Sequence, residues 1–489
     1  VQTEAGGEKN LVMPSASCVA NLNPLLEGYK EAAMLNPIYD PLYVIDVNET
    51  RYYLADSYEV SEDGMQITVK LKEGLKWHDG EAITADDMIF TMDVCSDTNN
   101  GAGGTNIVIL NDQPVKYEKV DDLTVKVTLP MASASYADLL GGLTLIPEHV
   151  FEGNPSVVSA GEANMKGIGS GPYKVTEFKQ DEYLLLEKYE DYYMGAPSID
   201  KVTFRIISDL SAQEVALMNG EVNFMELANA PAVAKYEADP NFTVVKYPEG
   251  RVNYLAVNKF CETVQDPKVV EAVFAALNRD EIIAGAYGDG MAESANSIFS
   301  NVNTFYDPSV EGYTQDVEKA KQLVKETGLD SRTLTLYFNS ERVYMKESAQ
   351  IIQQQLKNVG INLEVIPLES AGFFEKVFGT DGDYEFYLNG YGAVGDPDQV
   401  VAGMYDGTWG VNLAVSDEVS QLWKDARTVY TPEERAAIYK QIQIQTRDEL
   451  TCYPIAYPNY VFVTTSNIKG ADTIKRTPVF EDYTKLTME

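Results

Sequence analysis

The sequence has few basic residues and lacks long apolar runs, and each shortage excludes a class of function. Its 489 residues include 38 Lys and Arg against 75 Asp and Glu, so the formal net charge is −37. Proteins that bind nucleic acids or anionic membrane surfaces need a basic face. We therefore expect neither kind of partner. The chain also has no uncharged apolar run of about 18 residues, the minimum for a membrane-spanning helix, so none is expected.

Histidine and cysteine are scarce, which limits metal and redox chemistry. Only two histidines occur, and Cys18, Cys95, Cys261 and Cys452 are spread over the whole length without C-x-x-C spacing. This pattern disfavours zinc ribbons and redox motifs. Four cysteines allow three disulfide pairings, free thiols remain an equal alternative, and the redox compartment stays open. We expect no metal and no cofactor.

The motifs of hydrolytic enzymes are incomplete. His78 lies in a turn and is predicted to be a surface or hydrogen-bonded turn residue, and His149 has no neighbouring metal ligand. Around Ser170 the motif G-x-S-x-G needs a glycine at position 168, where the sequence has Ile. The S-x-x-K at 466–469 has no companion motif. We predict that the protein is not an enzyme, although counting residues does not decide a triad built from distant positions.

The remaining pattern is typical of α/β layers. Apolar and polar residues alternate strictly over 66–72, which puts Ile67, Val69 and Leu71 on one face of a strand, and an Asp-Gly turn before it predicts a hairpin over 54–72. Thr84 and Asp87 then have the spacing of a helix N-cap with an acidic residue at the third helical position.

Later segments repeat a rhythm of helix, glycine and strand. A capping box at 211–214 predicts a helix start. Apolar stripes at 317–324 and 352–359 end at Gly328 and Gly360, and strands are predicted at 334–338 and 362–366. The length corresponds to about three domains, and the rhythm favours mixed sheets covered by helices.

Several segments, in this order, resemble the extracytoplasmic solute-binding proteins of ABC importers, within the dipeptide, oligopeptide and nickel binding family. The strongest block is LADSYEVSEDG, VKLKEGLKWHDG and TADD within residues 54–87. Weaker similarity extends from Asn23-Pro24 through GSGPY at 169–173 and AALNRD at 275–280 to residues 434–441. The resemblance covers almost the whole chain.

The resemblance implies a two-lobed, type II periplasmic-binding-protein-like α/β fold with an additional inserted α/β domain. Mapped here, lobe I would comprise residues 1–44, 167–253 and 461–489, the inserted domain 45–166, and lobe II 254–460. The two lobes would close around a solute, with hinge segments absorbing the backbone change.

The resemblance also implies ligand-binding residues. In similar peptide binders a segment after the N-terminal Asn-Pro pairs with the ligand backbone, and Glu27, Gly28 and Tyr29 take that place here. An aromatic residue followed by an Asp holds the ligand ammonium. Here Tyr391 and Gly392 are followed by Val394, which stands where that Asp is expected.

The valine leaves open how a ligand ammonium would be neutralised. Either Asp396 or Asp398 takes the role, or the ligand has no α-amine. As an alternative, Asp-Pro-Asp is simply a favourable turn.

Trp409, near glycines, and Tyr457, in the second of two segments that would connect the lobes, are candidates to line the cleft between the lobes. For Tyr457 packing in the hinge is an equal alternative, and for Tyr391 the alternative is a core aromatic residue. Arg251 lies near the first segment that would connect the lobes and is a candidate to bind a ligand carboxylate. A structural ion pair is the favoured alternative.

We predict the extracytoplasmic substrate-binding component of an ABC transporter, which captures a short peptide for a membrane permease and acts as a monomer. Within this class an oligosaccharide or other non-peptide solute is the alternative. Other classes are a secreted hydrolase and a signalling receptor that presents a peptide. The polar stretch at 3–10 resembles the tether after a lipidated cysteine, which implies anchoring outside a Gram-positive membrane, with a periplasm as alternative.

Overall fold

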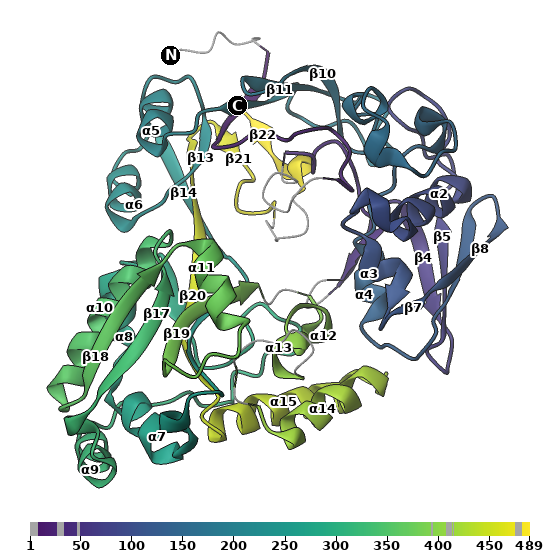
Figure 1. The fold of residues 1–489 in the computed structure, drawn as a ribbon. Coiled ribbons are helices and arrows are strands. Elements are labelled where there is room, and N and C mark those ends of the chain that lie inside the picture. The colour runs from purple at the N-terminus through teal and green to yellow at the C-terminus, as the bar shows by residue number, and fades with distance from the viewer. Residues whose placement is uncertain are drawn as a thin grey trace. The chain divides into compact units, whose positions relative to one another are not determined.

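A computed structural model describes residues 8–26, 34–45, 49–392, 395–406, 413, 415–474 and 482–489. The chain forms two compact units (Figure 1). Unit 1 contains residues 1–228, 232–247 and 461–489, and unit 2 contains 229–231 and 248–460. The predicted lobe II therefore falls within unit 2, and the predicted inserted domain falls within unit 1.

One sheet of unit 1 has the strand order β1-β12-β11-β10. Strand β1 runs parallel to β12, and the other pairs are antiparallel. Met13 lies opposite Phe204 in the parallel pair. The strands are β1 (Asn10–Ser15), β10 (Tyr173–Lys179), β11 (Tyr183–Lys188) and β12 (Lys201–Ile206).

The second sheet of unit 1 is the antiparallel β4-β5-β9-β8. Strands β4 and β5 form the predicted hairpin, and Ile67, Val69 and Leu71 are all buried in its core, as the alternation predicts. Thr84 is the N-cap of α2 with Asp87 at the third helical position, as predicted, and the two form a capping box. The elements are β4 (Ala55–Val60), β5 (Gln66–Leu71), β8 (Lys116–Asp121), β9 (Thr124–Thr128) and α2 (Ala85–Ser96).

One helix start in unit 1 differs from the prediction. Helix α5 begins at Leu210, and its N-cap is Asp209, whose carboxylate accepts a hydrogen bond from the Ala212 backbone N–H. The capping box predicted at Ser211 is therefore wrong by two residues, because Asp209 is an equally good cap and comes first along the chain.

The remaining elements assigned wholly or mainly to unit 1 are short connections and small sheets. They are β2 (Tyr43–Ile45), β3 (Thr50–Tyr52), α3 (Thr105–Val108), β6 (Ile109–Leu110), β7 (Gln113–Pro114), α4 (Tyr136–Gly141), α5 (Leu210–Met218), β13 (Phe224–Glu226), α6 (Ala230–Glu237), β14 (Phe242–Pro248), β21 (Ile468–Lys469) and β22 (Thr487–Met488).

The core of unit 2 is a mixed sheet with the order β20-β15-β19-β17-β18. Strand β19 is antiparallel to β15 and parallel to β17. Leu255 and Val257 pack in a core on one face, and Val252 and Tyr254 in a core on the other. The strands are β15 (Arg251–Val257), β16 (Ala292–Ser294), β17 (Thr333–Asn339), β18 (Asn362–Leu368), β19 (Phe386–Gly392) and β20 (Cys452–Thr465), which continues into unit 1.

Helices cover this sheet, and Figure 1 shows α10 beside β17 and β18. The predicted stripes and strands are confirmed, because α9 ends against Gly328 and α10 precedes β18. The helices are α7 (Pro267–Ala276), α8 (Arg279–Ala286), α9 (Val317–Thr327), α10 (Val343–Asn358), α11 (Ser370–Val377), α12 (Pro397–Val400), α13 (Ala402–Tyr405), α14 (Asp417–Thr428) and α15 (Pro432–Asp448).

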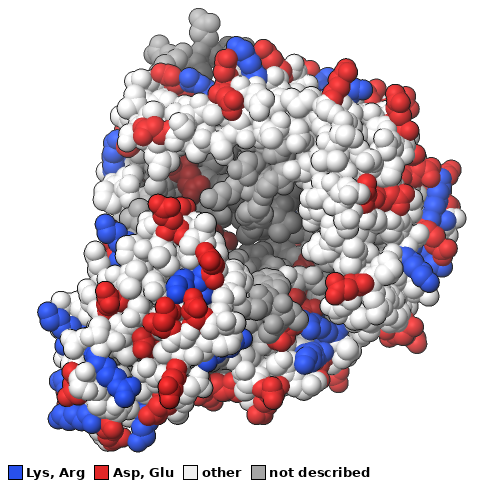
Figure 2. All heavy atoms as spheres, viewed as in Figure 1, with Lys and Arg blue, Asp and Glu red and all other residues white. Residues whose placement is uncertain are grey.

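Acidic side chains are spread over the visible face, with basic ones among them (Figure 2). All four cysteines are free thiols. Within the described ranges no helix has the length and hydropathy to cross a membrane. No group of three or more potential metal ligands occurs among those same residues.

Candidate functional site

Tyr391, the predicted ligand-contacting aromatic residue, lies on β19 and is held by unit 2 itself. Its hydroxyl donates to the Ile298 carbonyl at 2.6 Å and lies 3.2 Å from the Tyr405 hydroxyl. Its ring packs 5.2 Å from that of Tyr254. Gly392, the last residue of β19, is exposed. The strand thus ends with a rigid buried ring followed by an open backbone position.

Asp396 belongs to a buried ion pair. Its carboxylate accepts hydrogen bonds from both terminal nitrogens of Arg435, one at 2.9 Å, and from the hydroxyl of Tyr439 at 3.3 Å. The same carboxylate caps α12 through the Asp398 backbone N–H at 3.0 Å. Arg435 also donates to the Ala426 carbonyl and stacks on the Phe305 ring. The Asp396 charge is therefore neutralised within unit 2.

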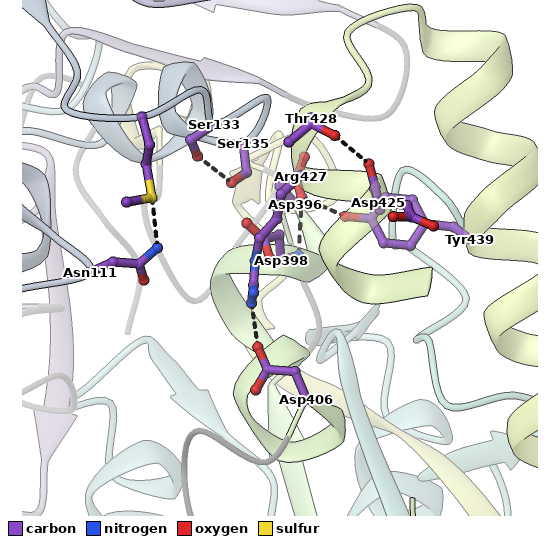
Figure 3. A network of polar contacts seen from close by, with 12 residues as sticks. Asn111, Ser133, Ser135, Asp396, Asp398, Asp406, Asp425, Arg427, Thr428 and Tyr439 are labelled. Atoms are coloured by element: carbon purple, nitrogen blue, oxygen red, sulfur yellow. Dashed lines mark hydrogen bonds and ion pairs between the residues drawn. The ribbon is translucent and has the colours of Figure 1, made fainter. Parts of the chain in front are cut away.

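Asp398 belongs to a second ion pair, in the same region. Figure 3 shows Arg427 between Asp398 and Asp406. The Arg427 Nε lies 2.6 Å from Asp398, and one Nη lies 2.5 Å from Asp406. A guanidinium can hold two carboxylates at once because its donors form a planar fork. The Asp-Pro-Asp turn is thus connected to α14 and α15 through arginines that sequence reasoning did not single out.

Tyr457, on β20, is also held inside unit 2. Its hydroxyl accepts from the Ser297 backbone N–H at 3.1 Å and donates to Asn296 Oδ1 at 3.0 Å. Arg251 donates to the carbonyl of Gly390 at 2.5 Å and to the Asn253 side chain. Both candidates thus have partners within their own unit. Glu27, Gly28, Tyr29, Val394 and Trp409 lie outside the described residues.

Unit 1 contains a cavity of about 340 Å³ that the sequence did not indicate. Three methionines and three phenylalanines contribute to its lining: Met13, Met34, Met225, Phe204, Phe224 and Phe462. They come from segments that are far apart in sequence, so no local motif marks them. The β1–β12 pairing brings the first of these segments to Phe204, at the carboxyl end of a parallel pair, where ligands bind in open α/β sheets.

Comparisons with known proteins identify the family. The family model described as bacterial extracellular solute-binding proteins, family 5 middle, matches residues 49–412. The dipeptide-binding protein of Escherichia coli (strain K12) is 27% identical, and the match covers 94% of this chain and 92% of that protein. These matches span both units, and the relatives named here are solute-binding proteins.

Two solved structures match along nearly the full length. The ABC transporter substrate-binding protein CtaP from Listeria monocytogenes gives a TM-score of 0.91 at 33% identity, covering 98% of this chain and 99% of the other. The putative peptide-binding protein AppA from Clostridium difficile gives 0.90 at 34% identity, covering 98% and 100%. The predicted type II periplasmic-binding-protein fold is confirmed. The chain therefore belongs to the bacterial extracellular solute-binding proteins of family 5.

Proposed function

We propose that this protein captures a short peptide outside the cytoplasmic membrane and delivers it to the permease of an ABC importer. The observation that carries the proposal is the full-length similarity to the putative peptide-binding protein AppA, at a TM-score of 0.90 and 34% identity. The dipeptide-binding relative, matched over 94% of this chain, supports the same ligand class. Units 1 and 2 would act as the two lobes, with residues 45–166 as an inserted domain of lobe I.

The ligand-contacting residues of this proposal are those that the family resemblance indicates. In lobe II they are Tyr391, Gly392, Val394, Asp396, Asp398, Trp409 and Tyr457, and in lobe I they are Glu27, Gly28 and Tyr29. Arg435 already neutralises Asp396, and Arg427 already pairs with Asp398. A buried ammonium needs a compensating charge. The ligand's α-amine would therefore remain hydrated or be neutralised by another acidic group.

Thermal unfolding in the presence of ligand panels tests the ligand class. One panel contains mixtures of di- to pentapeptides, and the other contains oligosaccharides, with free amino acids as the control. A ligand at a hundredfold excess over its Kd stabilises the folded protein by about 2.7 kcal/mol, so peptides should raise the melting temperature. Stabilisation by sugars alone would contradict the peptide assignment. Mass spectrometry of the released ligand separates binding from hydrolysis, because a receptor returns the peptide intact.

Anchoring and transport are tested in the producing cell. We expect to find the protein in the membrane fraction and to release it with detergent, because a lipid anchor would attach it to the outer face of the membrane. A soluble extracellular protein would contradict the anchor and leave peptide capture unaffected. Deletion of the gene should abolish uptake of the peptides that stabilise the purified protein, and unchanged uptake would contradict the transport role.

A further inference from the structure

The cavity in unit 1 is chemically suited to one kind of ligand group. Six of its fourteen lining residues are Met or Phe, and Glu226 is the one charged residue among the fourteen. Five of those six, all except Met13, are at most 5% exposed and belong to the buried interior of unit 1. Flexible methionine side chains adapt to apolar groups of different shape. An anionic group buried among such residues would lose its hydration without gaining a counter-charge. The lining therefore favours apolar over anionic groups, and Glu226 adds to the rejection of anionic ones.

The size of the cavity fits a large side chain. The cavity has a volume of about 340 Å³. Ligand pockets for small molecules begin at about 300 Å³. The cavity is thus large enough for one Leu, Met or Phe side chain with part of its backbone.

One wall of the cavity has apolar surface that the protein leaves uncovered. Leu210, the first residue of α5, lines the cavity and is 56% exposed. Gln213, on the same helix, also lines the cavity, and its side-chain amide already donates to the Ile207 carbonyl at 2.7 Å. An apolar ligand group would cover Leu210 without breaking this hydrogen bond.

We infer that this cavity is a specificity subsite that receives an apolar side chain of the bound peptide, with Leu, Met and Phe preferred and Asp and Glu rejected. The inference rests on the proposed function, because it assigns the cavity to the ligand of that same receptor. Full burial of such a side chain favours binding by roughly 10- to 100-fold over a small polar one.

Synthetic tetrapeptide mixtures with one defined residue test the inference in the full protein. The defined residue is Leu, Met, Phe, Ser, Asp or Lys, it occupies each position in turn, and calorimetric titration gives the Kd. At one position the wild-type protein should bind the Leu, Met and Phe mixtures at least tenfold more tightly than the Asp mixture.

A pair of variants on one helix then locates the preference. Leu210→Glu places a carboxylate at the cavity wall, whereas Val215→Glu places one on the same helix at a residue that is equally exposed, at 57%, and does not line the cavity. Both changes leave the core intact. We expect Leu210→Glu to weaken binding of the Leu, Met and Phe mixtures about tenfold and to strengthen binding of the Lys mixture. Val215→Glu should retain the wild-type ranking of affinities.

A second variant blocks the cavity sterically. Ala16, an exposed residue, also contributes to the lining, and Ala16→Phe would fill part of the volume from its edge. In this variant the affinity for the Leu, Met and Phe mixtures should fall toward the affinity for the Ser mixture. The control Ala234→Phe, on the exposed side of α6, should leave all affinities unchanged.

The outcomes separate the inference from the proposed function. Peptide binding without an apolar preference, or equal rankings in Leu210→Glu and Val215→Glu, overturns the subsite and leaves the peptide receptor standing. If none of the tetrapeptide mixtures binds while an oligosaccharide does, the proposed function fails and the subsite fails with it.

Discussion

Two buried aspartates, one in each unit, have different electrostatic environments. Asp40 in unit 1 is 0% exposed, and its Oδ2 accepts hydrogen bonds from the hydroxyls of Tyr192 at 2.8 Å and Tyr193 at 2.7 Å. Its Oδ1 has no hydrogen-bond partner among the described residues. Asp396 in unit 2 is 8% exposed and is paired with Arg435. One carboxylate has neutral donors, and the other has a cation.

Lys72, whose positive charge acts on Asp40, already has hydrogen-bond partners of its own. The Lys72 ammonium donates to the backbone carbonyls of Tyr52, Tyr53 and Ala55, two of them at 2.9 and 3.0 Å. Burial raises the pKa of Asp40 to about 7, the tyrosine hydrogen bonds and Lys72 oppose the rise, and Asp482 adds to it. Charge balance, rather than depth of burial, therefore distinguishes the two sites. We expect the unit 1 site to respond to pH and the unit 2 site to respond to loss of its arginine.

The largest effect is expected from Arg435→Met. This change removes the cation and leaves the Asp396 charge buried, which costs about 3–5 kcal/mol of folding free energy. Urea unfolding followed by hydrogen exchange in the peptides of α15 measures the loss. Arg332→Met, at an exposed position of the same unit, should change stability by less than about 0.5 kcal/mol. Equal effects of the two variants would contradict the charge-balance explanation.

Asp40→Asn is expected to raise the stability of the protein, by less than Arg435→Met lowers it. The native pKa of Asp40 is raised from 3.8 to about 7, so its contribution to stability is present at low pH and is lost as the pH rises through 7. The full shift corresponds to roughly 4 kcal/mol. Asparagine keeps the shape but loses the stronger bonds to a charged oxygen. We therefore expect a gain of about 2–3 kcal/mol at pH 8.

The pH profile of unfolding tests this prediction. The advantage of Asp40→Asn over the wild-type protein should grow between pH 4 and 7 and then level off. Asp191→Asn, at an exposed residue next to Tyr192, should show no such trend. A constant difference at all pH values would mean that Asp40 does not titrate in this range.

His78 extends the comparison to a half-buried base in the same unit. Its Nε2 donates to the Gly171 carbonyl at 2.9 Å, and its Nδ1 accepts from the Gly169 N–H at 3.2 Å. This arrangement requires the neutral ring, and burial lowers the pKa of His78 to about 4. As the pH falls, His78 takes up a proton in the unfolded chain at a higher pH than in the folded protein. Stability therefore falls as the pH drops from 6.5 toward 4.

We expect the His78 contribution to decrease by about 2 kcal/mol between pH 7 and pH 5. His78→Gln should flatten this acidic limb and lower stability modestly at neutral pH, and pH-dependent urea unfolding measures both changes. His149, exposed and paired with Asp79 at 2.8 Å, provides the control His149→Gln. An acidic limb unchanged in His78→Gln would assign the pH dependence to other groups.

Much of the fold could be predicted because local physical rules determine it. The alternation that buries Ile67, Val69 and Leu71 is a property of six consecutive residues, and the Thr84 capping box needs only four. The same locality explains the error at α5. Two good caps, Asp209 and Ser211, lie two residues apart, and the sequence pattern does not rank them.

The candidate site was less predictable because its geometry depends on distant residues. Asp396 and Arg435 are separated by 39 positions, and no spacing rule connects them. The cavity is lined by segments from Met13 to Tyr483, which only the completed fold brings together. His78 was predicted to be a surface or hydrogen-bonded turn residue and is hydrogen-bonded, but its partners lie about 90 positions away and could not be named.

The smallest effect is expected from Arg427→Lys, which tests whether geometry matters in addition to charge. The Arg427 side chain is 26% exposed and contacts Asp398 and Asp406 through different nitrogens. Lysine keeps the positive charge but has one compact ammonium, which cannot hold both carboxylates in the planar arrangement. We expect a loss of about 1 kcal/mol, measured by urea unfolding, and no measurable loss for Arg332→Lys. If both substitutions are neutral, charge alone is sufficient at this second site, and the fork geometry of arginine contributes only where, as at Arg435, the pair is fully buried.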